Sequence, residues 1–338
     1  MAAKKIKVGF TYDAKADYKL LPGQAPDKYS EFDTEETLSD IEGALRSGGY
    51  DVERIGNAPS LLKKISKGAK WDIVFNIAEG VSGRNRESQV PAILEMFGIP
   101  YTGSDALAMG ITLDKAVAKM ILAYHGLSTP RFVEASSEKD LKDFKLKFPV
   151  IVKPSEEGTS KGISSDSVAQ DLAGVRKRVR AIVKTYGQPA LVEEFISGQE
   201  FTVAVIGNDP PEVLPPVQIS LQGKADLGDE FYTHTRAELG NSEIEYICPS
   251  RAPERLLKKI EVLALGAYRA IGCRDMGRID IRVDRRGIPY FLECNPLPHL
   301  GSIDVFPLVA LATGRTHRSI IVDILEHGMK RYNISGKR

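Results

Sequence analysis

The 338-residue sequence predicts an α/β protein built in three parts. Its length exceeds the roughly 250 residues at which one hydrophobic core stops growing, so more than one core is expected. Apolar strands alternate with amphipathic helices in the first third, and further strands surround a polar, glycine-containing loop. We therefore expect an N-terminal parallel-sheet domain over residues 1–104, a central α+β subdomain over 105–190 and a C-terminal mixed-sheet subdomain over 191–338.

The first part alternates strands and helices, as a parallel sheet covered by helices requires. Apolar residues recur at helical spacing after Asp33 or Thr34, either of which can cap a helix, and Gly48 can end it. We expect strands at 6–11, 50–55 and 71–77 and helices at 34–47 and 88–97.

The other two parts contain more strands, separated by helices with apolar faces. A loop-rich stretch is expected between residues 221 and 243, and a hairpin between 277 and 295. We expect further strands near 132 and at 148–153, 191–196 and 200–206, and helices at 113–125, 170–184, 253–271 and the C-terminus.

Composition and charge exclude several classes of protein. Forty-six basic and 45 acidic side chains leave a net charge of +1, so no overall field recruits nucleic acid or an anionic membrane. The basic run at 176–180 lacks the aromatic residues typical of nucleic-acid binding and fits a solvated helix face. No signal segment and no run of about 18 apolar residues occurs, which predicts a cytoplasmic protein with no membrane partner.

Two further absences narrow the function. Cys248, Cys273 and Cys294 are odd in number and widely spaced, which predicts reduced thiols rather than a disulfide framework or a zinc site. No GxGxxG segment follows the first strand and no GxxxxGK[ST] segment occurs, which disfavours a dehydrogenase or a P-loop enzyme.

The predicted hairpin carries the clearest chemical signal. Because side chains alternate along a strand, Arg278 and Asp280 share one face, and Glu293 and Asn295 lie together on the second strand. Two carboxylates and an amide oxygen on one sheet face suit Mg²⁺, which prefers oxygen ligands. The alternative is a solvated hairpin face that holds a surface ion pair.

Lys153 ends an apolar strand and is followed at once by a loop that contains Gly158 and Gly162. A lysine beside a loop rich in backbone N–H groups and hydroxyls can clamp a phosphate. The alternative is a solvated strand end, and Lys115 on its own helix could likewise be a surface residue.

Taken in order, these segments resemble the ATP-grasp superfamily, specifically the D-alanine:D-alanine ligase family. The resemblance covers about 200 residues in unbroken family order. The matching stretches are Ile99-Pro-Tyr-Thr-Gly-Ser104, Leu113-Asp-Lys115, Val152-Lys-Pro-Ser155, Glu157-Gly-Thr-Ser160, Glu193-Glu-Phe-Ile-Ser-Gly198, Glu200-Phe-Thr-Val203, Cys248-Pro249, Gly277-Arg-Ile-Asp280 and Leu292-Glu-Cys-Asn295.

The resemblance implies an ATP-grasp fold that holds ATP and two Mg²⁺ ions, with Mn²⁺ as a substitute. It implies that Lys115 and Lys153 contact the ATP phosphates and that Arg278 faces the reacting carboxyl group. Catalytic roles are thus implied for Arg278 and Lys153. The implied nucleotide-binding residues are Lys115, Lys153, Glu157, Gly158, Thr159, Ser160, Gly162, Glu193, Glu194, Phe195, Ile196 and Glu200, and the implied metal ligands are Asp280, Glu293 and Asn295.

The segments that recognise substrate depart from the family pattern. The family's N-terminal Gly-Gly-x-Ser-x-Glu, whose glutamate holds the first alanine's ammonium, is replaced by Val8-Gly-Phe-Thr-Tyr-Asp13. The usual His-Gly turn is Glu79-Gly80, and the usual ending after Asn295 is altered. ATP chemistry is therefore expected to be kept and substrate recognition to be changed.

Five residues in these altered segments are candidate substrate contacts, together with Arg278. Glu79 follows the strand at 71–77 and could hold an ammonium at the carboxyl end of the sheet. Arg84 and Arg86 could bind a carboxylate in bidentate fashion, which predicts a substrate more acidic than alanine. Alternatively, Glu79 pairs with one of these arginines and only shapes the loop. His234 and His299 lie in segments that the resemblance places over the active site.

We therefore expect an ATP- and Mg²⁺-dependent carboxylate–amine ligase that joins amino acids or similar small molecules through an acyl phosphate. One alternative is a nucleotide-binding regulatory protein without catalysis. Another is a kinase that forms an acyl phosphate and stops there. The expected partners are small-molecule substrates, and a homodimer is compatible with this interpretation.

Overall fold

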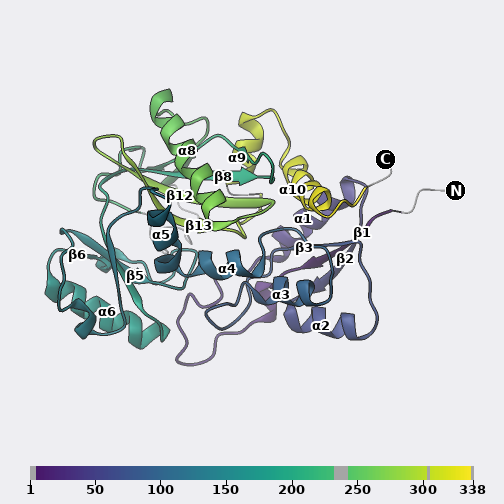
Figure 1. Cartoon of the computed structure of the whole chain (residues 1–338), viewed down its shortest axis with the longest axis horizontal. Helices are drawn as coiled ribbons and strands as arrows, with labels where there is room; N and C mark the ends of the chain where they lie inside the picture. Colours follow the sequence, from purple (N-terminus) through teal and green to yellow (C-terminus); the bar gives the residue numbers. More distant parts are fainter. Residues whose placement is uncertain (1–4, 232–242, 303–304, 336–338) are drawn as a thin grey trace.

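The computed structural model describes residues 5–231, 243–302 and 305–335. Three separate β-sheets form the protein, each with its own covering helices (Figure 1). The expected α/β fold class is confirmed, with a parallel N-terminal sheet followed by antiparallel sheets. Among the described residues, no helix is both long and apolar enough to span a bilayer.

The N-terminal sheet is parallel and has the strand order β2-β1-β3. Thr34 caps the first helix, because its hydroxyl accepts a hydrogen bond of 3.3 Å from the backbone N–H of Thr37. Residues 14–33, here called the strap, connect β1 to α1 and include the 3₁₀ helix η1 (Lys15–Asp17). The other elements are β1 (Lys7–Thr11), α1 (Glu35–Ser47), β2 (Asp51–Gly56), α2 (Ala58–Ser66), β3 (Ile73–Asn76) and α3 (Gln89–Met96).

The central sheet is antiparallel, with the order β4-β7-β5-β6. The apolar face of α6 covers it, and Val175 and Val179 share a buried core with Val150 and Val192. The elements are β4 (Phe132–Ala135), η2 (Glu138–Leu141), β5 (Val150–Pro154), η3 (Ser165–Ser167), β6 (Val168–Ala169), α6 (Leu172–Tyr186) and β7 (Ala190–Glu194).

The C-terminal sheet has the order β11-β10-β8-β12-β13, and β9 pairs with β8. All of its pairings among the described residues are antiparallel, so the expected mixed sheet is replaced there by an antiparallel one. The elements are β8 (Gly198–Ile206), β9 (Glu212–Val213), β10 (Val217–Leu221), β11 (Ile244–Ile247), α8 (Glu254–Ile271), β12 (Met276–Asp284) and β13 (Pro289–Asn295).

Two consecutive helices, α4 (Ala106–Leu113) and α5 (Lys115–Tyr124), pack on this C-terminal sheet and on α8. Asp114 leaves helical geometry between them, and its carboxylate caps α5 by accepting a 3.0 Å hydrogen bond from the Val117 N–H. The sequence predicts one helix over residues 113–125 and no separate helix in the position of α4. This break fixes the start of α5, and therefore the position of Lys115, at the sheet surface.

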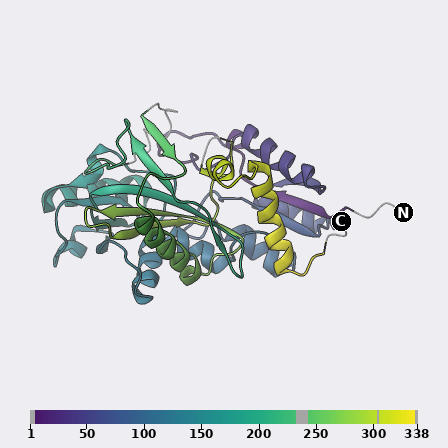
Figure 2. The same ribbon diagram turned by 90° about the horizontal axis from the view of Figure 1, so that it is seen from above.

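The C-terminal end of the chain returns to the N-terminal sheet (Figure 2). Where one C-terminal helix was expected, there are two, α9 (Val305–Ala312) and α10 (His317–Arg331). The latter packs against α1, and Ile320 and Ile324 share one buried core with Val8 and Phe10. The first and last segments therefore fold as one body.

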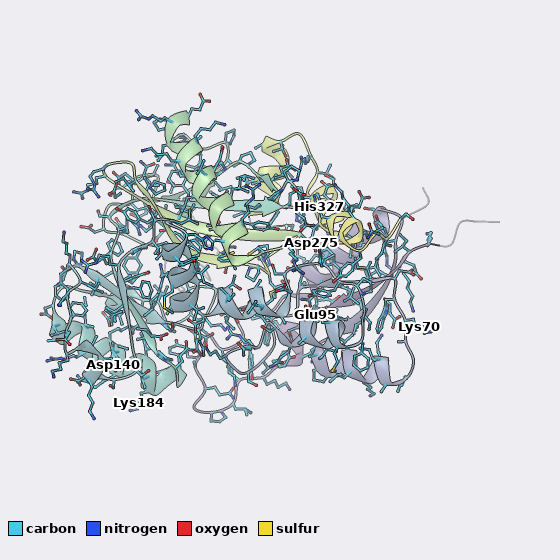
Figure 3. All side chains as sticks on the ribbon, in the orientation of Figure 1. Lys70, Glu95, Asp140, Lys184, Asp275 and His327 are labelled. Carbon is cyan, nitrogen blue, oxygen red and sulfur yellow. The ribbon has the colours of Figure 1, made fainter. Side chains whose placement is uncertain are left out.

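A buried carboxylate ties these parts together just before β12 (Figure 3). Asp275 accepts hydrogen bonds from the Gly103 N–H at 2.9 Å, from Asn208 at 2.7 Å and from the Arg331 guanidinium at 2.7 Å. Its partners come from the end of the N-terminal part, the loop after β8 and α10, so the joint holds the N-terminal and C-terminal sheets in fixed relation.

Candidate active site

A cavity of about 410 Å³ lies where the three sheets meet. The strap and the end of β3 form one wall, the central sheet and its loop a second, and strands β8, β12 and β13 a third. Most residues singled out from the sequence line it, namely Glu79, Lys153, Gly158, Thr159, Ser160, Glu193, Glu194, Phe195, Ile196, Glu200, Arg278, Asp280, Glu293, Asn295 and His299.

The third wall is the hairpin of β12 and β13, in which Asp280 lies opposite Glu293 and Arg278 opposite Asn295. Asp280 accepts hydrogen bonds from Thr202 at 2.6 Å and from the Asn295 amide at 3.1 Å, and Arg278 lies 3.3 Å away. Burial raises the pKa of Asp280, since neighbouring positive charge only partly offsets desolvation. Two carboxylates, an amide and a guanidinium therefore meet on one sheet face.

These side chains fit a magnesium ion that shares its ligands with phosphate and water. Among the described residues, no three Asp, Glu, His or Cys side chains converge to enclose a metal alone. The hairpin offers two carboxylates and one amide, and Mg²⁺ in proteins commonly takes one or two carboxylates plus phosphate oxygens and waters. The donor set thus suits a metal bound jointly with a phosphorylated ligand.

Two lysines lie beside Glu293. Lys115 at the start of α5 places its Nζ 3.1 Å from Glu293 Oε2, and it also donates to the backbone carbonyl of Glu157. Burial alone would raise the pKa of Glu293, but Lys115 and Lys153 outweigh it and lower that pKa. Glu293 is consequently held as a carboxylate.

A buried charge cluster lies behind the central wall. Glu193 bridges two lysines, with Oε1 2.6 Å from Lys153 Nζ and Oε2 2.8 Å from Lys119 Nζ. Although burial opposes ionisation, these lysines lower the pKa of Glu193 to about 2. Burial lowers the pKa of Lys119 to about 8, even with Glu193 beside it. The site therefore contains one more buried cation than Glu193 can neutralise.

An aromatic and apolar strip follows Glu193 on the same wall. Phe195 lies 4.8 Å below the Arg282 guanidinium and 5.8 Å from the ring of Phe231, while Ile196 lines the cavity beside it. Glu200 pairs with Arg282 at 3.3 Å. A flat ring can be held between such side chains, with a polar group within reach of Glu200.

The glycine-containing loop closes over the cavity and docks on the strap. Thr159 and Ser160 adopt left-handed backbone angles, with φ of 48° and 53°. The Gly158 N–H donates to Glu31 at 2.9 Å, and Lys161 lies 2.6 Å from the same carboxylate. The loop is therefore fastened to a glutamate of the N-terminal part.

The two arginines expected to bind substrate do not line the cavity. Arg84 pairs with Asp114 at 3.0 Å on the surface, and its charge is satisfied there. Arg86 is buried and lies 3.2 Å from both Glu31 and Glu157. Because neither guanidinium is free to meet a ligand, the expectation of a substrate more acidic than alanine loses its basis. Neither arginine forms an ion pair with Glu79 either.

The structure places only one of the two histidines that were expected to contact substrate. His299 lines the cavity with Nε2 3.8 Å from Asp33, while His234 falls outside the described residues. Sequence reasoning gave no role to Glu31, Glu87 or Lys119. Lys119 lies one helical turn after Lys115, a spacing that could have revealed it, but no local pattern marks Glu31, because its partners lie more than 50 residues away.

Comparison with known proteins agrees with this geometry. The profile of the family described as D-ala D-ala ligase C-terminus matches residues 115–326. A D-alanine–D-alanine ligase of Bordetella petrii is 31% identical over 94% of this chain and 91% of its own. An uncharacterized protein of Sinorhizobium fredii, y4sG, is 38% identical over 77% of this chain and 75% of its own.

Among solved structures, the D-alanine–D-alanine ligase of Bacillus anthracis complexed with ATP superimposes with a TM-score of 0.71. It is 21% identical, and the match covers 98% of this chain and all of that one. At that identity the likeness establishes the ATP-grasp fold. Together with the family profile and the sequence relatives, it shows that this chain belongs to the D-alanine–D-alanine ligase family, whose members are ATP-dependent, ADP-forming ligases that use Mg²⁺.

Proposed function

We propose that this protein joins the carboxylate of one amino acid, or a similar small molecule, to the amine of another through an acyl phosphate. The observation that carries the proposal is that one cavity has a phosphate-type loop and Lys153 on one wall and the Arg278–Asp280–Glu293–Asn295 group on the next. A carboxylate oxygen attacks the γ-phosphorus of ATP and ADP leaves. The second substrate's amine then attacks the acyl carbon, and inorganic phosphate leaves.

The nucleotide takes the wall formed by the central sheet. Lys115, Lys153 and the loop at 157–162 hold its phosphates, because these groups bring cations and N–H donors to one place. The base lies along the strip at 193–196, and Glu200 faces the ribose. Lys153 releases Glu193 when it turns to a phosphate, and Lys119 keeps that glutamate neutralised.

Asp280, Glu293 and Asn295 hold two Mg²⁺ ions, and Mn²⁺ can replace them because its ligand preferences are similar. When bound, the metal neutralises phosphate charge in phosphoryl transfer. Arg278 lies against Asp280 at the same face and stabilises the oxyanion that forms at the acyl carbon. One such donor typically contributes about 3 to 4 kcal/mol.

Substrate enters between the hairpin and the N-terminal sheet. Glu79 and His299 line this end, and D-alanine specificity is not carried over because the family's N-terminal glutamate has no counterpart in residues 8–13. The three divisions at 1–104, 105–190 and 191–338, a cytoplasmic location and a homodimer remain predictions. Light scattering tests the dimer.

The decisive experiment is an ADP-release assay with Mg²⁺, ATP, and D- and L-amino acids offered singly and in pairs, followed by mass spectrometry of the product. Ligation requires one inorganic phosphate and one condensed product per ADP. Phosphate transfer to one substrate without condensation would instead indicate the kinase. Nucleotide binding with no turnover for any pair would indicate a regulatory protein.

A further inference from the structure

Two carboxylates at the substrate end of the cavity have no charge partner. Glu79 and Glu87 both line the cavity, and within the described residues neither makes a hydrogen bond or an ion pair. Glu87 is only 6% exposed, and its buried Oε2 accepts no hydrogen bond there. A buried oxygen in that position is costly unless a donor or a cation reaches it.

The nearby cations are already used. Arg86 and Lys161 each contact both Glu31 and Glu157, so two positive charges balance two negative ones. Lys115 pairs with Glu293 of β13 at 3.1 Å. The positive charges near Glu79 and Glu87 are therefore already balanced by other carboxylates. Glu79 and Glu87 are two further acidic groups that no cation balances.

Other groups on this wall do not change the balance. Asp33 adds a third carboxylate, and His299 faces it at 3.8 Å. Lys15 also lines the cavity, but it is exposed on the strap and forms no ion pair with Glu79 or Glu87. Burial and mutual repulsion keep protons on the unfilled site, since burial raises the pKa of Glu79 well above its usual range and that of Glu87 to about 7.

We propose that Glu79 and Glu87 form a subsite for two positive charges, and that the amino acid bound there carries a basic side chain as well as its α-ammonium. The proposal rests on the ligase function above and specifies its substrate class. One ammonium would neutralise one carboxylate and leave the other buried and unpaired. A diamino carboxylic acid supplies both cations, while its own carboxylate lies toward Arg278. The substrate preference is thus the reverse of the acidic one suggested by Arg84 and Arg86.

Lysine and norleucine test the proposal directly, because the two differ mainly in the terminal ammonium. ADP release is measured with each of them, and with ornithine and alanine, in both enantiomers, each offered alone and paired with alanine. We expect kcat/KM for the best basic amino acid to exceed that of norleucine at least tenfold. Norleucine or alanine used equally well would overturn the inference but leave the ligase function intact.

The variant Glu87→Gln tests whether the preference for lysine over norleucine arises at this subsite. The variant should lose most of the discrimination between lysine and norleucine and keep the KM for ATP. It should melt no lower than the parent, because the Glu87 side chain makes no hydrogen bond or ion pair among the described residues that the change would break. Glu254→Gln, on the exposed start of α8, is the matched control and should change nothing. Discrimination that survives in Glu87→Gln would refute the assignment.

A separate binding measurement covers the case in which no amino acid releases ADP. Calorimetric titration with lysine, in two buffers of different ionisation enthalpy near pH 7, should show binding and proton release, because the incoming cation displaces protons from the two carboxylates. Norleucine should bind at least tenfold more weakly. Equal binding of the two would reject the subsite even if the protein proved not to be a ligase.

Discussion

Glu31 Oε2 and Lys161 Nζ lie 2.6 Å apart and join two segments that are 130 residues apart in the chain. Both side chains are almost fully buried, and Glu31 also accepts hydrogen bonds from the Gly158 N–H and from Arg86. The strap thus supplies an anion to the loop that is proposed to close over phosphate. The position of that loop is therefore coupled to the N-terminal part through Glu31, and also through Asp27, which accepts a 3.0 Å hydrogen bond from the Gly162 N–H.

Glu31→Gln should destabilise the protein by about 3 kcal/mol, because breaking a buried ion pair leaves Lys161 and Arg86 short of negative charge. Burial opposes ionisation, but Lys161 and Arg86 lower the pKa of Glu31 from 4.5 to about 2. A depressed carboxyl pKa stabilises the fold above the unfolded-state pKa near 4.5, and this contribution is lost as the pH falls toward 2. Denaturant unfolding from pH 7 to pH 3 should show the difference between parent and variant shrinking.

Glu36→Gln on the exposed first turn of α1 serves as the control and should leave stability nearly unchanged. A Glu31→Gln variant as stable as the parent at pH 7 would mean that the strap and loop do not depend on this charge.

Lys119→Met should raise the KM for ATP about tenfold. With Lys119 gone, Glu193 has Lys153 as its one remaining lysine partner, so Lys153 is held on the carboxylate and is less available to phosphate. The KM for the amino-acid substrate should not change, because this cluster lies behind the nucleotide wall. Lys119→Arg keeps the charge and should restore much of the ATP affinity. Equal loss of both substrates' affinities would indicate general damage to the fold instead.

Glu293→Gln should reduce turnover at least a hundredfold, because it removes a carboxylate from the proposed metal site. Glu293 also pairs with Lys115, which keeps its hydrogen bond to the Glu157 carbonyl in the variant, and the change leaves no hole in a hydrophobic core. ADP release is measured across a range of Mg²⁺ concentrations, with circular dichroism to verify folding. Asn295→Ala should act in the same direction but less strongly. Near-normal turnover in Glu293→Gln would remove this residue from the metal site.

The sequence predicts the local parts of this protein better than its long-range contacts. Strand alternation places Asp280 beside Arg278, and the hairpin pairing that sets Asp280 opposite Glu293 follows from adjacent strands. Glu31 is different, because its partners are Arg86, Gly158 and Lys161, all of them more than 50 residues away in the chain. Only the packing of the strap against the central loop creates that contact. The role of a charged residue such as Arg86 likewise depends on which oppositely charged side chain lies nearest to it in the folded protein, and the sequence alone does not show this.

The last prediction concerns Arg84 and Arg86. The sequence suggests one shared role for them, in binding substrate, whereas the structure places them in different environments. The Arg84 side chain is 59% exposed, so solvent screens its ion pair with the buried Asp114, which also keeps its hydrogen bond from the Val117 N–H. Arg84→Ala should therefore leave the substrate KM unchanged and lower stability by no more than about 1 kcal/mol. Arg86→Ala should lower stability by about 3 to 5 kcal/mol, because it leaves Glu31 and Glu157 buried beside one lysine. Thermal melts and substrate kinetics on the two variants decide the matter. A rise in substrate KM in Arg84→Ala at unchanged stability would return that arginine to the substrate site.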